Sequence, residues 1–519
     1  MLPALISVIV SFSIIGVAVT EVTLTNFSTI ANSIKAQQAL NLAETGVNYY
    51  MWHLNHNNTD YTDGHTSGNT LTTYGYGPYV HQYVDINGVN EGTYTIYINP
   101  PANSNSSIVT IRSIGQPANS PITKTIQAQV GIPSFASYAV VSDSDLWFGS
   151  NETASGPVDS NQGVRMDGPN TSTVSSANAT YVPSYSFGGD GASHPGVWCS
   201  SSVTSPVNCL TRSTKDWTYP VPTIDFNQVS SSLCTLKKLA FSSSTSTSSL
   251  NSGSNPCGQT PTTLTDAYIP RTSSTASLTK GYLIILNPNT TYDLYRVSSQ
   301  NDTRSSYLSA LGLTLISTGN AIPSNGVVYV EDNVWVVSNP DFHGRLTIAA
   351  GRLTATSSSS YSNITIAGPI VYSTKNGNDA IGLISQNNIT IAPYAPPSPS
   401  TGAVSFEVDG ALLSENGNVW FPDTYQSAPY TCTVGWVASN QKMVFYGSVA
   451  TRQVWTWSWL DGGYQCGNAS YDPGSGSYIS GFLYDNTQYD YNLLYDPPPS
   501  YPLTSGYNIL SWREILTHP

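Results

Sequence analysis

Charged side chains are scarce in this sequence and make up only 9% of its 519 residues. The 18 Lys and Arg are outnumbered by 31 Asp and Glu, which gives a net charge of −13. Without a basic face, the chain cannot displace counterions from a phosphate backbone, which argues against nucleic acid as a partner. Intrinsic disorder is not expected either, because the aromatic content of 11% can build a core. The length favours two or three structural units.

Catalytic motifs are missing as well. The sequence contains no HExxH, P-loop, dinucleotide fingerprint or nucleophile elbow. Two acidic pairs, Asp143 with Asp145 and Asp485 with Asp490, have no Lys or Arg close to them in sequence. The chain is therefore expected not to be an enzyme and to need no cofactor.

Metal ligands are few. His53, His56 and His65 could gather around a metal ion, but imidazoles near the end of a helix also suit its dipole. No metal site is expected there. No CxxC motif is present, so zinc is not expected at the cysteines either.

Cysteine is rare, and its six copies fall into three pairs that are close in sequence. An even number of cysteines in Ser-, Thr- and Gly-rich loops indicates disulfides formed in an oxidising compartment. The predicted pairs are Cys199–Cys209, Cys234–Cys257 and Cys432–Cys466.

A long apolar start is what the sequence does contain. Leu2 to Thr20 carries no charge and is long enough to span a hydrocarbon core as a helix. It lacks the basic start and the small-residue cleavage site of a signal peptide. Apolar residues then recur at a helical period as far as Met51, and only Glu21, Lys35 and Glu44 interrupt them with charge. One helix of about 55 residues is therefore predicted.

The β-branched cluster Val17 to Thr25 follows Gly16 and is the weak point of this helix, where local unwinding would be unsurprising. One interpretation of the helix is a single-pass anchor with a stalk. The favoured one is a filament helix, whose first half exchanges lipid for identical neighbouring helices while its second half packs on its own domain. The predicted filament-core residues are Leu5, Ile6, Ile9, Phe12, Ile14, Ile15, Gly16, Glu21, Phe27 and Ile30.

A small-residue pattern marks the second half of the helix, at Ala36, Ala39, Ala43, Glu44, Gly46 and Val47. Together with the uncharged start, this pattern resembles the type IV pilin-like family, closest to its PilX-type module. The resemblance implies a membrane precursor in the inner (cytoplasmic) membrane and then a bacterial surface filament of identical subunits. It also implies a prepilin peptidase and the pilus assembly machinery as partners.

One position departs from the family pattern. Most type IV pilins carry a glutamate at the fifth mature position, which pairs with the amino terminus of a neighbouring subunit. If Met1 is the mature first residue, this chain has Leu5 there. The departure favours a minor-pilin lineage or a divergent branch.

The body of the chain has the pattern of β structure, so an α+β fold is expected. Alternating strands at Tyr94–Ile98, Ile108–Arg112 and Thr123–Val130 predict a pilin-like antiparallel sheet within residues 56–133, after the helix of residues 1–55. From 134 to 519, short apolar runs with tight turns and no helical spacers predict a parallel β-solenoid, with a β-sandwich as the alternative. Residues 199–275 are expected to be a Ser/Thr-rich insertion, and the aromatic C-terminal segment is expected to cap the solenoid.

Trp455, Trp457 and Trp459 alternate along one predicted strand. Such a stripe could be an adhesive surface, but a core or a subunit interface is favoured. The function expected from the whole sequence is a structural subunit of an extracellular type IV pilus-like filament that displays a β-domain for attachment to a host-cell or surface receptor. The alternatives are a minor tip pilin acting as adhesin or assembly primer, and a membrane-anchored surface binding protein that never polymerises.

Overall fold

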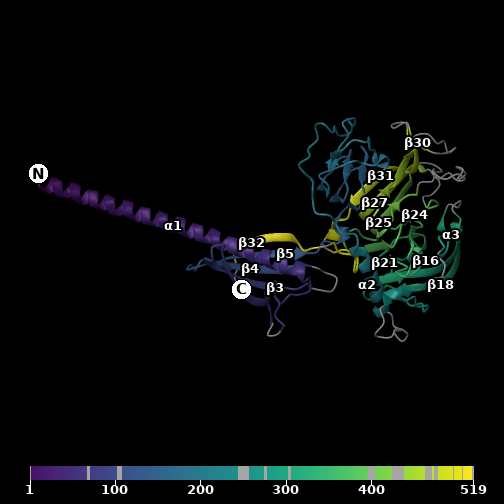
Figure 1. Cartoon of the computed structure of the whole chain (residues 1–519), viewed down its shortest axis with the longest axis horizontal. Coiled ribbons are helices and arrows are strands. Elements are labelled where there is room, and N and C mark those ends of the chain that lie inside the picture. Colours follow the sequence, from purple (N-terminus) through teal and green to yellow (C-terminus); the bar gives the residue numbers. More distant parts are fainter. Residues whose placement is uncertain are drawn as a thin grey trace. The chain divides into compact units, whose positions relative to one another are not determined.

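The computed structural model describes residues 2–66, 70–101, 108–243, 256–273, 277–301, 306–395, 404–422, 438–461, 470–472, 477–494, 496–504 and 506–516. The chain forms two compact units (Figure 1). Unit 1 comprises Met1–Pro133 together with Gly506–Pro519, and unit 2 comprises Ser134–Ser505. A long N-terminal helix and a mostly β body make the fold α+β, as expected.

Unit 1 is built on the helix α1 (Leu2–His56), which runs without a break (Figure 1). The weak point at Val17 to Thr25 does not unwind. Penalties for β-branched residues in a helix are only tenths of a kcal/mol each. The hydroxyls of this stretch also find acceptors within the helix, since Thr20 donates to the Gly16 carbonyl at 2.8 Å and Thr23 to the Val19 carbonyl at 2.7 Å.

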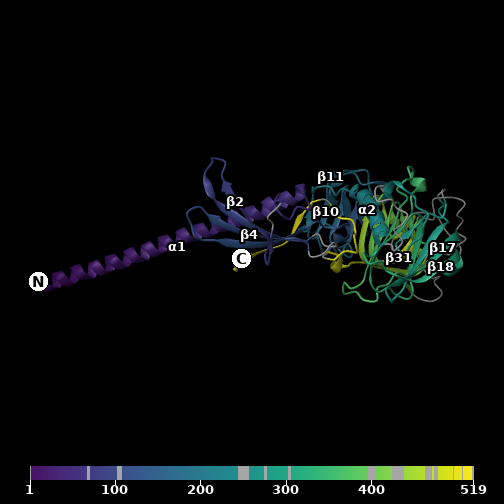
Figure 2. The ribbon, with the colours of Figure 1, turned by 90° about the horizontal axis from the view of Figure 1, so that it is seen from below.

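An antiparallel sheet lies along the C-terminal part of α1 (Figure 2). Its strand order is β1-β2-β3-β4-β5-β32. The strands are β1 (Leu71–Thr72), β2 (Gly75–Val84), β3 (Asn90–Asn99), β4 (Val109–Pro117), β5 (Lys124–Gly131) and β32 (Asn508–Ile515).

The prediction for the C-terminal segment needs correction only in its last strand. Leu493 and Tyr501 pack in a core cluster of the β-rich body. β32 instead pairs with β5, so that Ile509 lies opposite Val130 and Trp512 opposite Ala128. Without β32, β5 would be an edge strand with a row of unpaired backbone groups. Unit 2 is thus inserted in the chain between two neighbouring strands of one sheet.

Small residues set the distance between α1 and its sheet. A Cβ atom added at Gly46 would lie 2.2 Å from the Ser113 Oγ atom, and one added at Gly115 would lie 2.0 Å from the Ala39 carbonyl oxygen. Ala39 and Ala43 are fully buried at this contact. The larger helix residues that pack into the same core are Val47, Tyr50 and Leu54.

Unit 2 contains three sheets with parallel pairing. The longest follows the order β14-β10-β8-β6-β27-β25-β23-β21-β19-β15. Its strands are β6 (Val140–Ser142), β8 (Val158–Ser160), β10 (Val174–Ser176), β14 (Trp217–Thr218), β15 (Tyr268–Ile269), β19 (Val327–Val330), β21 (Arg345–Ala350), β23 (Ala380–Ser385), β25 (Val404–Ser414) and β27 (Ala438–Thr451).

The second sheet follows the order β18-β17-β16-β20-β22-β24-β26-β28, and the third follows β13-β9-β7. Their strands are β16 (Gly281–Leu286), β17 (Thr291–Gln300), β18 (Leu311–Ala321), β20 (Asn333–Ser338), β22 (Ile364–Ile366), β24 (Ile389–Ile391), β26 (Val419–Trp420), β28 (Trp455–Thr456), β7 (Leu146–Phe148), β9 (Val164–Met166) and β13 (Val197–Trp198).

Further elements surround these sheets. They are β11 (Thr180–Tyr181), β12 (His194–Pro195), β29 (Ser458–Asp461), β30 (Ser470–Asp472), β31 (Ser477–Tyr489), α2 (Gln228–Ser243), α3 (Tyr307–Ala310) and the short 3₁₀ turns η1 (Phe135–Ser137), η2 (Tyr185–Phe187), η4 (Pro256–Gly258), η5 (Ser358–Ser360) and η6 (Tyr491–Leu494).

From β19 to β28, consecutive strands alternate between the longest and the second sheet. A ladder of asparagines holds the turns of this winding together. The Asn333 Oδ1 atom accepts from the Asn363 amide at 2.9 Å, Asn363 Oδ1 from the Asn388 amide at 3.2 Å, and Asn388 Oδ1 from the Asn418 amide at 2.8 Å. Each asparagine therefore supplies an acceptor for the next turn of chain.

The solenoid prediction is confirmed only in its parallel pairing. The described strands form several separate sheets and no closed solenoid, because β17 and β18 pair antiparallel and the second and third sheets do not join. The described part of residues 199–275, which was expected to be an insertion, also contributes to the core of unit 2. Its helix α2 buries Val229, Leu233 and Leu236 in a core cluster, because these positions share one face of the helix.

The close contact between α1 and its sheet can be tested by adding one methyl group. Gly115→Ala places a Cβ atom against the Ala39 carbonyl, so we expect unit 1 to lose about 1–3 kcal/mol of unfolding free energy through overpacking. Denaturant-dependent hydrogen exchange of unit 1 amides, measured on the full chain in detergent, checks this value.

The matched control is Gly16→Ala, whose added Cβ atom would have no other atom within 4 Å. Equal amide protection in both variants would contradict the role given to Gly115.

Candidate functional site: the exposed half of α1

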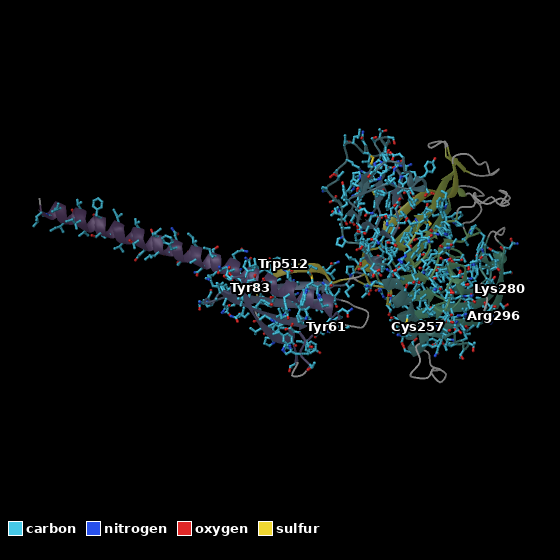
Figure 3. All side chains as sticks on the ribbon, in the orientation of Figure 1. Tyr61, Tyr83, Cys257, Lys280, Arg296 and Trp512 are labelled. Carbon is cyan, nitrogen blue, oxygen red and sulfur yellow. A yellow bond between two sulfur atoms is a disulfide. The ribbon has the colours of Figure 1, made fainter. Side chains whose placement is uncertain are left out.

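The first half of α1 has a continuous apolar surface that the rest of the described chain does not cover (Figure 3). The large predicted filament-core side chains are between 54% (Ile6) and 72% (Phe12) exposed, and Gly16 and Glu21 are exposed too. Such a surface is not stable in water as a monomer and requires lipid or other protein to cover it. α1 is the one helix among the described residues that is long and apolar enough to cross a membrane.

Polar groups on this half are adapted to an apolar environment. Ser11 donates to the Ser7 carbonyl at 2.8 Å and Ser13 to the Ile9 carbonyl at 2.9 Å, so these hydroxyls need no water. Glu21 is the only charged side chain before Lys35. Gly16 leaves an open notch in the helix surface, which permits the close approach of another helix.

The pilin-like motif residues lie on the other half, where α1 meets its sheet. Ala39, Ala43, Gly46 and Val47 are buried, whereas Ala36 and Glu44 are half-buried. The motif thus marks the part of the helix that packs on its own domain, and the surface before it stays free.

The histidines at the end of α1 have separate protein partners. His53 Nε2 lies 3.0 Å from Asp60 Oδ2, and His56 Nδ1 lies 2.8 Å from the Trp52 carbonyl oxygen. His65 stacks on Tyr79 with ring centroids 4.9 Å apart. His53 and His65 thus contact residues beyond α1, whereas the partner of His56 is within the helix.

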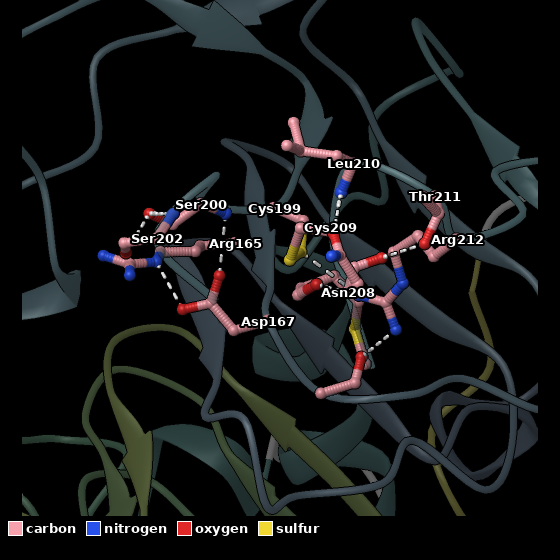
Figure 4. Close-up of a disulfide and its surroundings, with 12 residues drawn as sticks. Arg165, Asp167, Cys199, Ser200, Ser202, Asn208, Cys209, Leu210, Thr211 and Arg212 are labelled. Carbon is pink, nitrogen blue, oxygen red and sulfur yellow. Dashed lines mark hydrogen bonds and ion pairs between the residues drawn. A yellow bond between two sulfur atoms is a disulfide. The ribbon is translucent and has the colours of Figure 1, made fainter. Parts of the chain in front are cut away.

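Two of the three predicted cysteine pairs, Cys199–Cys209 and Cys234–Cys257, are disulfides in the structure. The third, Cys432–Cys466, lies outside the described residues. Figure 4 shows the first pair beside Asp167, the one grouping of metal-ligand residue types found in the described part of the chain. Its sulfurs are bonded to each other, and Asp167 accepts from Arg165 Nε at 2.7 Å and from the Ser200 amide at 2.9 Å.

The tryptophan stripe lies mostly in the core of unit 2. Trp455 and Trp457 are 6% and 4% exposed, with ring centroids 6.0 Å apart. Trp459 is half-buried, and its Nε1 atom donates to the Phe421 carbonyl at 2.9 Å. The strand breaks between β28 and β29, so the three side chains do not form one exposed platform.

In the structure, the aspartates of the two acidic pairs noted in the sequence have separate hydrogen-bond partners. Asp143 accepts from Asn161 Nδ2 at 2.6 Å, and Asp490 accepts from the Tyr446 hydroxyl at 2.8 Å. Asp485 instead lies beside Glu152, a residue that sequence reasoning missed because nothing in its local sequence points to a partner so distant along the chain.

Burial raises the pKa of both carboxyls in this second pair. Burial and the neighbouring Asp485 raise the pKa of Glu152 from 4.5 to about 8. Burial raises the pKa of Asp485 from 3.8 to about 6, although the Thr487 hydroxyl and the Lys442 ammonium oppose this shift. Glu152 therefore keeps its proton at neutral pH.

No protein-family model matches the chain, and none of the curated proteins matches it. Among solved structures it is similar to the competence-associated pilin ComZ from Thermus thermophilus, with 12% identity and a TM-score of 0.25 over 93% of this chain and 98% of that one. A likeness at this level decides neither fold nor function, and it gives no support to the PilX-type branch in particular.

The shifted carboxyls predict a pH dependence. The folded chain holds protons that the unfolded chain releases. The stabilising contribution of Glu152 is therefore complete below pH 4.5 and is lost as the pH rises to about 8, and that of Asp485 is complete below pH 3.8 and is lost as the pH rises to about 6. We expect unit 2 to unfold at a lower temperature at pH 8 than at pH 5, and Glu152→Gln to reduce this difference. Calorimetry of the full chain in detergent checks it.

Glu91→Gln, in unit 1, is the control and should leave the pH dependence of unit 2 unchanged. An identical pH dependence in the wild-type chain and the Glu152→Gln variant would contradict the assignment.

Cys432–Cys466 also remains a prediction that can be measured directly. Since the other cysteines are paired with each other, we expect these two to form the third disulfide. Peptide mapping under non-reducing conditions should recover one cross-linked peptide that contains both. Recovery of either residue as a free thiol would show that the pairing is wrong.

Proposed function

We propose that this chain is a pilin-like structural subunit that polymerises through the first half of α1. The observation that carries the proposal is the apolar surface of residues 2–34, which no other part of the described chain covers. A helix of this kind must be buried first in lipid and then, once the body is outside the membrane, among identical helices.

The helix suits both environments for the same reason. Lipid tails are as apolar as leucine, so exchanging lipid for neighbouring helices changes the hydrophobic free energy little. Assembly must then be favoured by close packing, for which the open notch at Gly16 and the internally bonded Ser11 and Ser13 hydroxyls are suited. A charge at a position facing a neighbour would cost several kcal/mol in every subunit.

In this proposal, the two halves of α1 have different roles, and the second half holds the helix to its own domain. Its contacts are already made with the sheet of unit 1, so polymerisation need not disturb the domain. Unit 2, with its disulfides, is suited to display outside the cell, where it would serve surface attachment. The resemblance to type IV pilins adds an inner-membrane precursor, a prepilin peptidase and the pilus assembly machinery to this proposal.

Two other functions use the same helix differently. A minor pilin at the filament tip would act as adhesin or assembly primer. An anchored surface protein that never polymerises would keep the whole helix in lipid. Abundance of the chain along sheared fibres distinguishes the main proposal from both.

A charge in the exposed half of α1 tests polymerisation. We expect Ile14→Asp to abolish surface fibres, because Ile14 is 63% exposed in the isolated chain and would be buried in a filament. Electron microscopy of sheared fibres and mass spectrometry of their main band give the readout. Immunoblots of the membrane fraction establish that the variant is inserted.

Thr59→Asp is the matched control, since Thr59 is an exposed residue beyond the end of α1, and its fibres should be normal. Normal fibres from a membrane-inserted Ile14→Asp variant would show that the helix is not in a filament core.

A further inference from the structure

An open groove of about 690 Å³ lies beside the first disulfide of unit 2. Three short strands contribute to its lining, namely β12 with His194 and Pro195, β13 with Trp198, and β14 with Trp217. The disulfide itself completes this part of the lining. The volume is within the roughly 300–1,000 Å³ of sites that bind small molecules.

Contacts behind the groove hold its strands in place. A Cβ atom added at Gly196, between β12 and β13, would lie 3.0 Å from the Tyr219 Cβ atom, so the two segments meet without room for a side chain. Arg212 follows the disulfide in sequence and donates to the Met166 and Gly168 carbonyls (Figure 4). Because the fold already fixes these positions, a ligand would not have to order them on binding.

Two aromatic rings of the lining can be reached from solvent. Trp198 is not one of them, since it is only 8% exposed and the His194 ring stacks on it at a centroid distance of 3.6 Å. Trp217 is half-buried, with the Arg212 guanidinium 5.6 Å from its ring centre on one face. Tyr219 is 38% exposed. Trp217 and Tyr219 therefore offer ring surface to a ligand in the groove.

Charge is absent from the surface that these rings border. No carboxylate, lysine or arginine is among the lining residues. The indole N–H groups are also used within the protein, since Trp198 donates to the Tyr181 hydroxyl at 2.9 Å and Trp217 to Asn170 Oδ1 at 3.2 Å. The lining thus offers neither an ion-pair partner nor an indole donor.

Hydroxyl groups are what the lining does offer. Thr214, Thr218 and Tyr219 are exposed, and their hydroxyls make no hydrogen bond to the residues that the structure describes. Each hydroxyl can donate one hydrogen bond and accept others. A ligand in the groove would therefore meet ring faces and hydroxyls side by side.

We propose that this groove binds a short neutral oligosaccharide, which stacks on Trp217 and Tyr219. A sugar ring has a face of C–H groups that packs on an aromatic ring, and its hydroxyls both donate to and accept from the threonine and tyrosine hydroxyls. A charged ligand would find no partner of opposite sign in the lining.

An extended peptide is the other ligand that aromatic grooves bind, but it needs donors for its carbonyl groups. Both indole N–H groups are already bonded here, which favours the sugar.

The inference gives a ligand class to the surface attachment proposed above, yet the binding concerns unit 2 alone and does not require a filament. Sugar binding should therefore be unchanged in the Ile14→Asp variant, which is expected to form no fibres. Loss of fibres and loss of sugar binding are separate results.

Direct binding to the full chain, in a detergent without a sugar headgroup, tests the proposal. Maltose, lactose, cellobiose and N,N′-diacetylchitobiose are each titrated to tens of millimolar and followed by calorimetry and saturation-transfer NMR. We expect at least one of them to bind saturably. Tyr219→Ala, which removes an exposed ring, should weaken that binding about three- to tenfold. Thr218→Val keeps the shape of the side chain but removes its hydroxyl, and should weaken binding about two- to fivefold.

Tyr185→Ala is the matched control. Tyr185 is a tyrosine of the same unit that is 93% exposed and does not line the groove. Sugar binding should be unchanged in this variant, and circular dichroism establishes that all variants are folded.

Three results would overturn the proposal. The first is that none of the four sugars binds saturably to the wild-type chain. The second is that binding is unaffected by both Tyr219→Ala and Thr218→Val, which would place the sugar elsewhere. The third is saturable binding of an oligoproline peptide that Tyr219→Ala weakens while no sugar binds, which would make the groove a peptide site.

Discussion

The close contact between α1 and the sheet of unit 1 is the constraint on which the other features of the chain depend. Gly46 on the helix and Gly115 on β4 leave no room for a side chain, so the backbones approach within van der Waals distance. Because the sheet is held against the second half of α1, the first half is left without intramolecular cover. One helix therefore has two surfaces with different partners, one fixed by its own fold and one available to lipid or to copies of itself.

The same sheet determines how unit 2 is attached. In the sequence, unit 2 follows β5 and precedes β32, and these two strands are neighbours in the sheet. Both ends of unit 2 are thus connected to the same sheet. Unit 1 cannot complete its sheet until the last residues of the chain are made, so the order of synthesis and the order of assembly differ.

Local signals in the sequence predicted local structure well. The length of α1, the small residues at its contact with the sheet and the two disulfides all depend on spacing within a short stretch of chain. The weak point after Gly16 does not unwind, because residue propensities alone leave out the internal hydrogen bonds of the threonine hydroxyls. Contacts between distant segments could not be predicted, because neither partner carries a local signal for the other. Examples are the pairing of β32 with β5 and the contact of Glu152 with Asp485.

The winding of unit 2 ends where its asparagine ladder ends. In the asparagine ladder each amide oxygen accepts from the next turn, and its last step runs from Asn418 Oδ1 to the Val454 amide at 2.9 Å. No asparagine continues the ladder beyond Val454 in the described chain, and the next strand, β28, is the edge of its sheet. Trp455 lies at that edge with its N–H group unpaired. The ladder and the alternation of strands between the two sheets therefore end at neighbouring residues.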